Sequence, residues 1–308
     1  MDLKGKDVLT ATQFTRPQIE HLFAQADDFS ARLTKGERLR NLDGRLLATL
    51  FYEPSTRTRL SFEAAMQRLG GGVISVAEAK TASSVVKGET LPDTVRTIAN
   101  YADAIVLRHP EIGAAQSAAE ASPVPILNAG DGAGEHPTQA LLDLYTIRAE
   151  KGRIDGLRIA LVGDLKNGRT VHSLSRALRH FKVELSLVAP AALAMPTQVT
   201  DSLRESGLSV EETNDLAKSL ETADVVYMTR IQKERFADQS QYEKLKDFYI
   251  LNRALVTKAK EGVVIMHPLP RVDEIATDVD ALPNAAYFRQ MKNGVYIRMS
   301  LLSEILGQ

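Results

Sequence analysis

Short apolar runs alternate with segments of helical periodicity along most of the chain. The apolar runs predict nine strands, at residues 46–52, 73–77, 104–107, 124–128, 158–162, 183–188, 208–210, 224–228 and 263–266. The helical spacing between them predicts helices that include 17–33, 60–69, 91–101, 137–150, 170–181 and 196–206. Strands that alternate with helices form parallel sheets covered by helices, so the sequence predicts an α/β protein.

The length of the chain and one break in the pattern predict two domains. A chain of 308 residues exceeds the usual size of about 150 residues per domain. A charged, glycine-containing stretch at 150–153 separates a helix from the next strand. We expect one domain of residues 1–150, to which an amphipathic C-terminal helix adds residues 290–308, and a second domain of residues 151–289. Each domain is expected to hold a parallel sheet flanked by helices.

The composition narrows the classes of protein that the chain could represent. Apolar residues make up 44% and charged residues 25%, as in soluble globular proteins, and no apolar run reaches about 18 residues. The N-terminal sequence lacks the apolar core of a signal peptide, so the cytoplasm is the expected location. A net charge of −1 gives no global attraction to nucleic acid or membranes. The absence of cysteine excludes thiolate zinc sites and a cysteine nucleophile.

A polar segment, 55–59, follows the first predicted strand and precedes a helical pattern. It reads Ser-Thr-Arg-Thr-Arg and places three hydroxyls and two guanidinium groups beside the unpaired N–H groups of a helix start. These groups together suit a dianion, most plausibly a phosphate. The plainer interpretation is that Ser55 or Thr56 only caps the helix and that Arg57 and Arg59 are solvated.

Further polar residues follow two more strands of the first domain. Arg108 comes directly after the strand 104–107, at the end where parallel sheets bind ligands. His136 and Gln139 follow a glycine-containing loop and lie three residues apart at a helix start. An arginine there can contact an anion, and a histidine can polarise a carbonyl oxygen or transfer a proton. A solvated arginine and a loop histidine bonded to the backbone are the alternatives.

The second domain repeats this arrangement. The segment 163–170 follows a strand but lacks the spacing of a dinucleotide fingerprint, so a redox cofactor is not expected. Arg169 at the helix start suits a carboxylate. Arg230 and Gln232 follow the strand 224–228 and share a face if the segment is extended, although a charged surface loop is the alternative.

Two remaining segments carry weaker signals. Residues 267–270 read His-Pro-Leu-Pro, and the two prolines fix the backbone so that carbonyl oxygens can be presented to an NH₂ group. Residues 83–89, which include Ser83 and Lys87, indicate by themselves only a surface loop.

The predicted strand ends share an excess of cationic groups. They are Arg57, Arg59, Arg108, Arg169 and Arg230, with Lys87 as a sixth. Arginines gathered in this way need counter-charges, and a phosphate together with two carboxylates would supply about four.

Three of these segments resemble the transcarbamoylase family. Residues 55–59, 136–139 and 267–270 occur in the family's order, and the resemblance runs from about Leu46 to the C-terminus. Within the family, the segment 230–235 is typical of the branch that acts on aspartate. The ornithine branch carries a His-Cys-Leu-Pro segment, whereas this chain has no cysteine.

The resemblance implies that carbamoyl phosphate and L-aspartate react to give N-carbamoyl-L-aspartate and phosphate, an early step of pyrimidine synthesis, with no metal or other cofactor. It implies that carbamoyl phosphate is bound by Ser55, Thr56, Arg57, Thr58, Ser83, Lys87, Arg108, His136, Gln139, Pro268 and Leu269. It implies that aspartate is bound by Lys87, Arg169, Arg230, Gln232 and Leu269. The implied catalytic groups are Arg57, Thr58, Lys87, Arg108 and His136.

The resemblance also has implications for assembly. In the family, Ser83 and Lys87 reach the site from a neighbouring subunit, so a homotrimer with shared active sites is expected. A separate zinc-binding regulatory chain is left open, as are two other functions. One is a transcarbamoylase for a different amino acid such as ornithine, and the other is a phosphate-binding protein without catalysis, because fold does not determine function.

Overall fold

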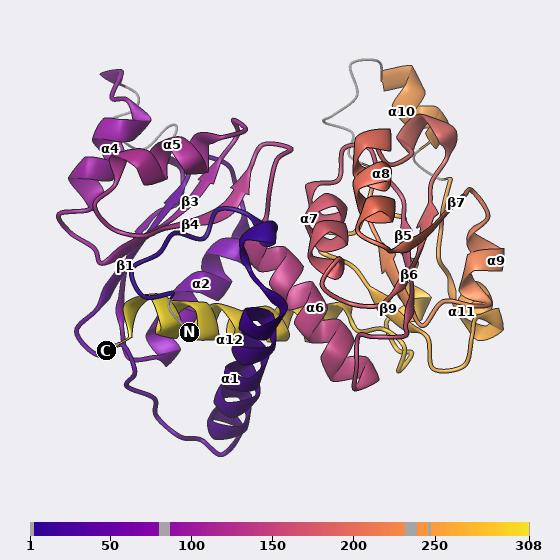
Figure 1. The fold of residues 1–308 in the computed structure, drawn as a ribbon, viewed down its shortest axis with the longest axis horizontal. Helices are drawn as coiled ribbons and strands as arrows, with labels where there is room; N and C mark the ends of the chain where they lie inside the picture. The colour runs from indigo at the N-terminus through magenta and orange to yellow at the C-terminus, as the bar shows by residue number, and fades with distance from the viewer. Residues whose placement is uncertain (1–2, 80–86, 232–238, 246–247, 308) are drawn as a thin grey trace. The chain divides into compact units, whose positions relative to one another are not determined.

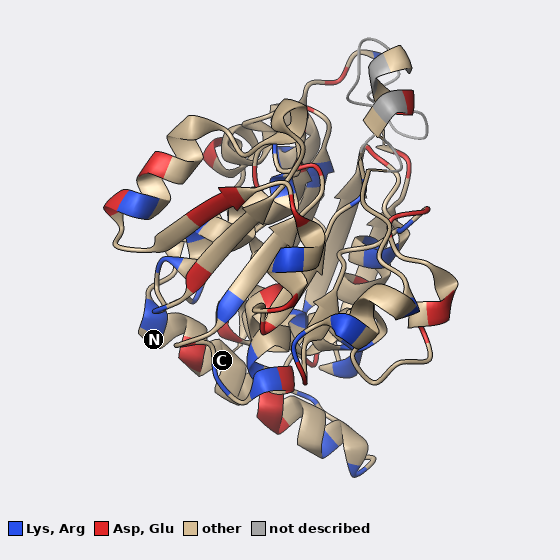
Figure 2. Cartoon of the chain, turned by 90° about the vertical axis from the view of Figure 1, so that its right-hand side faces the viewer, with Lys and Arg blue, Asp and Glu red and all other residues tan. Residues whose placement is uncertain are grey.

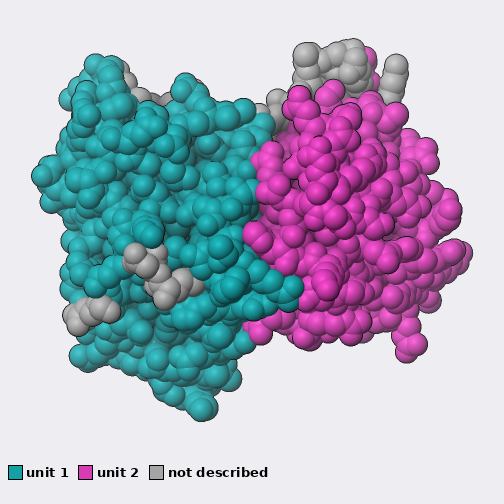
Figure 3. All heavy atoms as spheres, in the orientation of Figure 1, with its two compact units in different colours: residues 1–142, 292–308 teal, residues 143–291 magenta. Residues whose placement is uncertain are grey.

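The computed structural model describes residues 3–79, 87–231, 239–245 and 248–307. The chain divides into two compact units, one of residues 1–142 and 292–308 and one of residues 143–291 (Figure 3). Both units contain a parallel sheet flanked by helices, which confirms the predicted fold class. Among the described residues, no helix is both long enough and apolar enough to cross a bilayer.

The first unit has a four-stranded sheet in the order β2-β1-β3-β4. Its strands are β1 (Leu46–Phe51), β2 (Gly72–Val76), β3 (Ala104–His109) and β4 (Ile126–Asp131). Its helices are α1 (Arg16–Thr34), α2 (Thr56–Arg68), α4 (Leu91–Ile98) and α5 (Ala114–Ala121), with a short 3₁₀ turn η1 (Ala11–Gln13). In Figure 1, α4 and α5 lie on one side of this sheet, and α2 lies on the other.

The second unit has a five-stranded sheet in the order β7-β6-β5-β8-β9. Its strands are β5 (Arg158–Val162), β6 (Glu184–Val188), β7 (Ser209–Thr213), β8 (Val225–Met228) and β9 (Val264–Met266). Its helices are α7 (Arg169–Leu178), α8 (Thr197–Glu205), α9 (Leu216–Leu220), α10 (Gln239–Leu245) and α11 (Arg253–Lys258), with 3₁₀ turns η3 (Ala191–Leu193) and η5 (Thr277–Val279).

Two long helices pass from one unit to the other along the chain. They are α6 (Pro137–Lys151) and α12 (Tyr287–Leu306). The two chain ends lie close together in the first unit, where the Gly5 amide donates to the Ile305 carbonyl at 3.0 Å (Figure 1).

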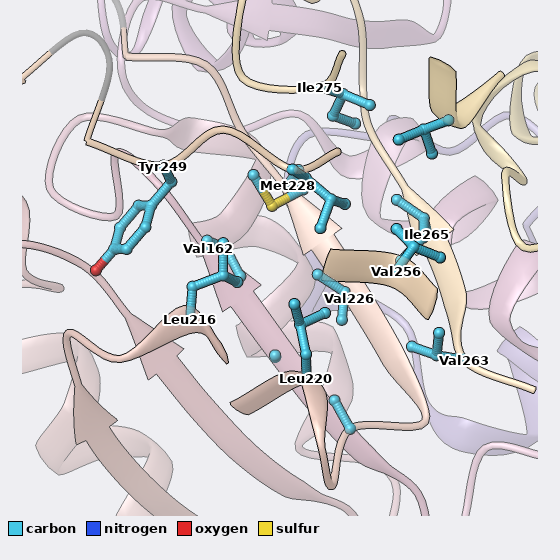
Figure 4. Packing of buried hydrophobic residues seen from close by; sticks show 14 of the residues in the cluster. Val162, Leu216, Leu220, Val226, Met228, Tyr249, Val256, Val263, Ile265 and Ile275 are labelled. Carbon is cyan, nitrogen blue, oxygen red and sulfur yellow. The ribbon is translucent and has the colours of Figure 1, made fainter. Parts of the chain in front are cut away.

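The apolar runs that predicted strands are the centres of both cores. Val162, Val226 and Met228 from the second sheet are fully buried against α9 and α11 (Figure 4). Strands covered on both faces are apolar at nearly every position, which explains why their sequences show runs and not alternation. All nine predicted strands are confirmed, within a few residues at their ends.

Two helices start earlier than the sequence predicted. The helix expected at 60–69 begins at Thr56, so the Ser-Thr-Arg-Thr-Arg segment forms its cap and first turn. The C-terminal helix expected within 290–308 begins at Tyr287 and continues through Gly294. A Cβ at Gly294 would lie 2.7 Å from Arg298 Nη1 and 3.0 Å from Leu142 Cδ2. This glycine therefore permits close packing and does not end the helix.

Aspartate side chains, half-buried in the first unit and buried in the second, bond to backbone N–H groups at the amino ends of both sheets. Asp103, just before β3, accepts from the Leu46 amide at 2.8 Å and from Arg45 at 2.7 Å. Asp224, just before β8, accepts from the Arg158 amide at 2.9 Å and from Lys260 at 2.6 Å. The opposite, carboxyl ends of the strands are left for ligands.

Candidate functional site

In the first unit, the predicted site residues follow three neighbouring strands. β1 pairs with β3 in parallel, with Phe51 opposite Arg108, and β3 pairs with β4. The segments after β1, at the end of β3 and after β4 carry 55–59, Arg108 and His136. Because parallel strands end at the same edge of a sheet, the topology brings these residues to one edge.

The start of α2 offers donors that its cap does not use. Ser55 is the N-cap residue, yet its side chain makes no capping hydrogen bond. Thr56 and Arg57 in the first turn are exposed, and Thr58 is buried. The first-turn N–H groups have no partners within a helix, and the helix dipole makes this end electropositive. The interpretation of Ser55 as an ordinary side-chain cap is therefore not supported, and an anion site is favoured.

The two arginines of this segment differ in exposure, Arg57 being exposed and Arg59 half-buried. Nη1 of Arg59 lies 3.2 Å from Glu63 Oε1 and 3.2 Å from Ser75 Oγ, so this guanidinium is tied to α2 and β2. Glu63 Oε1 also accepts from Thr49 and from Ser75. The sequence analysis counted six cationic groups that need counter-charges from a ligand. The ion pair with Glu63 supplies the counter-charge for one of them, Arg59.

Arg108 is held in a fixed orientation at the end of β3. Its Nη1 donates to the Ala129 carbonyl at 3.2 Å, and its Nε lies 3.4 Å from Glu53 Oε2. The side chain is only 13% exposed. It is not the solvated arginine that was the alternative interpretation of the sequence, because its side chain is largely buried and contacts the Ala129 carbonyl and the Glu53 carboxylate.

His136 and Gln139 lie where α6 begins, as the sequence predicted. His136 is 3% exposed and Gln139 6% exposed, and the Gln139 amide donates to the His136 carbonyl at 3.0 Å. The loop before them is fastened by Asp131, whose carboxylate accepts from the amides of Glu135 at 2.8 Å and Gly113 at 2.9 Å. Histidine and glutamine at this buried helix start can donate to a carbonyl oxygen and accept from an NH₂ group.

The second unit also places its predicted residues at adjacent strand ends. β8 lies between β5 and β9 in the sheet. Arg169 is the first residue of α7, after the N-cap Gly168, and it is half-buried. Arg230 follows Thr229, whose amide and hydroxyl donate to the Val162 carbonyl at 2.8 and 3.0 Å. Arg230 is thereby fixed beside the end of β5.

A glycine permits this close approach of two strand ends. Gly163 has a positive φ of 115°, and a Cβ there would overlap the Thr229 carbonyl oxygen. Gly163 begins the segment 163–170, which the sequence analysis compared with a dinucleotide-binding loop. Its role in the fold is to let the β5 and β8 connections pass each other, which agrees with the absence of the dinucleotide spacing.

The His-Pro-Leu-Pro segment after β9 has an unusual backbone. Leu269 has a φ of 54°, a conformation that costs a non-glycine residue free energy, and the Leu269–Pro270 peptide bond is cis. The Leu269 amide donates to His267 Nδ1 at 2.8 Å, and His267 Nε2 lies 2.7 Å from Glu274 Oε1. Backbone held in sparsely populated regions by surrounding bonds is typical of functional sites.

Glu274 is ionised in this arrangement. Burial would raise the pKa of Glu274, but the hydrogen bonds from His267 and from the Val272 amide bring the pKa below its usual value. A carboxylate only accepts, so His267 Nε2 carries the proton and donates. His267 Nδ1 is then free of a proton and accepts from the Leu269 amide, as the distances require.

Of the three remaining predicted site residues, the structure describes one and not the other two. Lys87 is described and exposed, in a short turn before α4. Ser83 and Gln232 lie outside the described residues. Basic and acidic residues are interspersed over the described chain (Figure 2). Within the described part of the chain, no group of three or more acidic or histidine side chains could hold a metal ion.

The sequence analysis missed the residues that support the His-Pro-Leu-Pro segment. Gln290 and Asp143 are fully buried and join His267 through hydrogen bonds. One signal was available for Asp143, because a carboxylate within the apolar run of the helix 137–150 requires a partner when buried. For Gln290 no comparable signal existed.

Both units thus present arginine, histidine and hydroxyl donors at the carboxyl edges of parallel sheets. A helix start with hydroxyls and an exposed arginine suits a phosphate, and arginines at strand ends suit carboxylates. Buried donors beside such anions can also stabilise an oxyanion that forms during acyl transfer. These features define a class of group-transfer enzymes that act on anionic substrates.

Comparison with known proteins identifies the family. Residues 6–149 match the family model for the carbamoyl-P binding domain of aspartate/ornithine carbamoyltransferase, and residues 155–305 match the model for its Asp/Orn binding domain. The chain therefore belongs to the aspartate/ornithine carbamoyltransferase family.

Individual relatives resemble the chain over its whole length. It is 53% identical to the aspartate carbamoyltransferase catalytic subunit of Thermococcus onnurineus over 307 residues, covering 100% of this chain and 99% of that protein. It is 54% identical to the Methanopyrus kandleri catalytic subunit, covering 98% of each. Aspartate transcarbamoylase of Trypanosoma cruzi, solved in complex with carbamoyl phosphate and aspartate, has a TM-score of 0.95 at 46% identity, covering 99% of this chain and 98% of that one.

Proposed function

We propose that this chain transfers the carbamoyl group of carbamoyl phosphate to the amine of L-aspartate. The products are N-carbamoyl-L-aspartate and phosphate, in de novo pyrimidine biosynthesis. The observation that carries this proposal is the start of α2, where Ser55 leaves its hydroxyl unused as a cap and Arg57 is exposed at the carboxyl edge of the first sheet. Full-length similarity to aspartate carbamoyltransferase catalytic subunits supports the same activity.

The phosphate end of the first substrate is assigned to the first unit. Ser55, Thr56, Arg57 and Thr58 bind it through hydroxyls, a guanidinium and the N–H groups of the helix start. Arg108 contacts both the phosphate and the carbonyl oxygen, and its bonds to Ala129 and Glu53 keep it oriented for this role. Residues 1–150 with the C-terminal segment 290–308 are accordingly the proposed carbamoyl phosphate-binding domain, and residues 151–289 are the proposed aspartate-binding domain.

The carbamoyl group and the aspartate are assigned to the remaining residues. Gln139 and the carbonyl oxygens of Pro268 and Leu269 accept from the carbamoyl NH₂ group. Arg169 binds the α-carboxylate of aspartate, and Arg230 binds the β-carboxylate. The proposed aspartate site is completed by Lys87, Gln232 and Leu269.

The chemistry follows from these assignments. The neutral amine of aspartate attacks the carbamoyl carbon, a C–N bond forms, and the carbonyl oxygen becomes negative. Thr58, Arg108 and His136 donate to this oxyanion, and such preorganised donors are worth about 3–4 kcal/mol each in comparable sites. The C–O bond to phosphate then breaks, the departing phosphate takes the proton that the attacking amine loses, and the helix start holds the charge of the leaving group. Holding two anions that would otherwise repel each other supplies much of the rate.

The proposed enzyme is a homotrimer in the cytoplasm with shared active sites. Lys87 is exposed in a turn between β2 and α4, and its role in a neighbouring subunit rests on the family resemblance. Ser83 is proposed to act beside it. A zinc-binding regulatory chain, if one associates, must supply its own thiolates because this chain has no cysteine.

The first experiment is a carbamoyl-transfer assay on the purified chain with carbamoyl phosphate and either L-aspartate or L-ornithine. We expect carbamoyl-aspartate to form and no carbamoyl-ornithine, because Arg230 would repel the ornithine amine. Turnover with ornithine alone would refute the assignment of the second pocket. Binding of carbamoyl phosphate without turnover of either amine would instead indicate a binding protein.

A further inference from the structure

A buried line of hydrogen bonds runs through the second unit to the His-Pro-Leu-Pro segment. The Tyr227 hydroxyl on β8 donates to Asp143 Oδ2 at 2.8 Å. Gln290 Nε2 on α12 donates to Asp143 Oδ1 at 2.7 Å. Gln290 Oε1 accepts from the His267 amide at 3.0 Å. Tyr227, Asp143 and Gln290 are all 0% exposed, so these bonds form away from water.

In this line of hydrogen bonds, the donor and the acceptor of each bond are fixed. The Asp143 carboxylate, when ionised, can only accept, so Gln290 must point its NH₂ group toward it. The amide oxygen of Gln290 therefore faces the backbone N–H of His267, and a flipped amide would place two acceptors or two donors against each other. Asp143 thus determines which atom of Gln290 reaches the segment after β9.

The ring of His267 fixes donors and acceptors within the His-Pro-Leu-Pro segment in the same way. Its Nε2 donates to Glu274, which leaves Nδ1 as the acceptor for the Leu269 amide at 2.8 Å. This bond fixes the plane of the Pro268–Leu269 peptide unit, which carries the Pro268 carbonyl oxygen. Leu269 itself has a φ of 54°, which is unfavourable for leucine and persists only where the surrounding structure holds it.

We propose that His267 and Gln290 are positioning residues that fix the carbonyl oxygens of Pro268 and Leu269 for the carbamoyl NH₂ group. This inference rests on the proposed function, in which those carbonyl oxygens accept from the substrate. Neither side chain needs to touch the substrate. Their contribution is to select the amide of carbamoyl phosphate, whereas the phosphate end depends on residues of the first unit.

The test compares two ligands that share a phosphate-like end. Phosphonoacetamide carries an amide NH₂ and is stable to transfer, whereas inorganic phosphate has no such group. Their dissociation constants are measured by calorimetry on the purified full-length protein. His267→Leu is compared with His267→Asn, because the Oδ1 atom of asparagine can stand close to the position of the imidazole Nδ1 and accept from the Leu269 amide.

We expect His267→Leu to weaken phosphonoacetamide binding roughly tenfold or more, since the ligand's NH₂ loses positioned acceptors. Phosphate binding should remain within about twofold, because its contacts lie on the first unit. His267→Asn should restore most of the lost affinity. Equal loss for both ligands, no loss for either, or no recovery in His267→Asn would overturn the positioning role.

A milder pair of variants covers the case in which His267→Leu does not fold. Tyr227→Phe removes the outermost donor of the line, and Tyr249→Phe removes a comparable hydroxyl that donates to the Asn214 carbonyl at 2.9 Å. Tyr227→Phe should weaken phosphonoacetamide relative to phosphate by about threefold, and Tyr249→Phe should leave that ratio unchanged. Equal ratios in the two variants would overturn the inference.

The same data separate this inference from the proposed function. If the unmodified protein binds phosphonoacetamide no better than it binds phosphate, the carbamoyl phosphate assignment fails, and the positioning role fails with it. If the unmodified protein discriminates the two ligands and His267→Leu discriminates equally well, only the positioning role fails.

Discussion

Two neighbouring arginines show how contacts separate residues that look alike in sequence. Arg57 and Arg59 are both in the first turn of α2, and the sequence grouped them as ligands for an anion. Arg59 bonds to Glu63 and to Ser75 on β2, whereas Arg57 is exposed beside the helix start. A structural role is therefore expected for Arg59 and a ligand-binding role for Arg57.

Substitution of these arginines should produce unequal effects. Arg57→Ala is expected to lower kcat/KM for carbamoyl phosphate by roughly a hundredfold or more, because a charged contact to the reacting phosphate is lost. Arg59→Ala, the matched control on the same helix turn, should lower it by no more than about fivefold, as for a partly exposed ion pair. Steady-state kinetics measures both. An Arg57→Ala enzyme within tenfold of the parent would refute the phosphate assignment.

A substitution at Gly163 tests how Arg230 is positioned. Gly163→Ala would place a Cβ against the Thr229 carbonyl and displace the residue that follows it, Arg230. We expect KM for aspartate to rise by roughly tenfold while KM for carbamoyl phosphate changes little, since a shift of about 1 Å is costly at a binding group. Gly262→Ala, at another positive φ where a Cβ would come no closer than 4.0 Å to Lys151 Nζ, is the control. Equal effects of the two variants on KM for aspartate would contradict this expectation.

At the scale of the elements, the two edges of each sheet have different roles. The amino edge contributes to stability, and the carboxyl edge carries the predicted ligand-binding residues. Asp103 and Asp224 fasten the starts of neighbouring strands at the amino edges. The predicted ligand-binding residues follow the carboxyl ends. Because parallel strands all point the same way, one edge can be closed by structural carboxylates while the other keeps its donors for substrates.

The amino-edge carboxylate in the second unit should make stability depend on pH. Burial would raise the pKa of Asp224, but bonds from the Arg158 amide and from Lys260 hold the pKa below its usual value of 3.8. The ionised group therefore stabilises the fold fully above the pKa of the unfolded state, and this contribution is lost as pH falls through the lower folded-state pKa.

We expect Asp224→Asn to unfold more easily than the parent at pH 7, by about 1–3 kcal/mol. The difference should shrink as pH falls below about 4, because the parent's advantage depends on the carboxylate. Urea denaturation at a series of pH values measures both curves. Asp201→Asn, on the exposed face of α8, serves as the control and should show no such convergence. A gap that stays constant down to pH 3 would show that the charge of Asp224 is not responsible.

At the scale of the whole molecule, the proposed donors follow strands of two separate sheets, and Lys87 lies between β2 and α4 in the first unit. In the proposed trimer Lys87 would act in a neighbouring subunit, since a closed ring of identical chains places the same loop beside the same pocket three times.

Mixed trimers test this arrangement. Arg57→Ala and Lys87→Ala trimers should each be nearly inactive. When the two variants are unfolded together, mixed and refolded, random assembly should restore roughly a quarter of the parent activity, because each mixed trimer gains one site free of both substitutions. Each variant refolded alone is the control, and an assay of carbamoyl-aspartate is the measurement. Absence of recovery, with mixed trimers shown to form, would mean that Lys87 acts within its own chain.

Much of this protein could be predicted from local sequence patterns. The nine strands are confirmed, most of them because buried parallel strands are apolar along their length, as in β5 and β8, whereas the edge strands β2 and β7 are partly exposed. The predicted residues of the described strand ends, such as Arg108 and His136, lie at the carboxyl edge because alternating strands and helices permit little else. The family resemblance added the reaction, and the comparisons confirm that family.

Tertiary structure alone decided which polar groups are bound to one another. Glu63 is close to Arg59 in sequence, but Ser75 and Thr49 join that pair only when β1 and β2 align. Gln290 is 23 residues from His267 and 147 residues from Asp143, and it links them only because α12 and α6 pack in the second unit. Periodicity reports which face of an element is buried, but the partner of a buried polar group depends on contacts between elements distant in sequence.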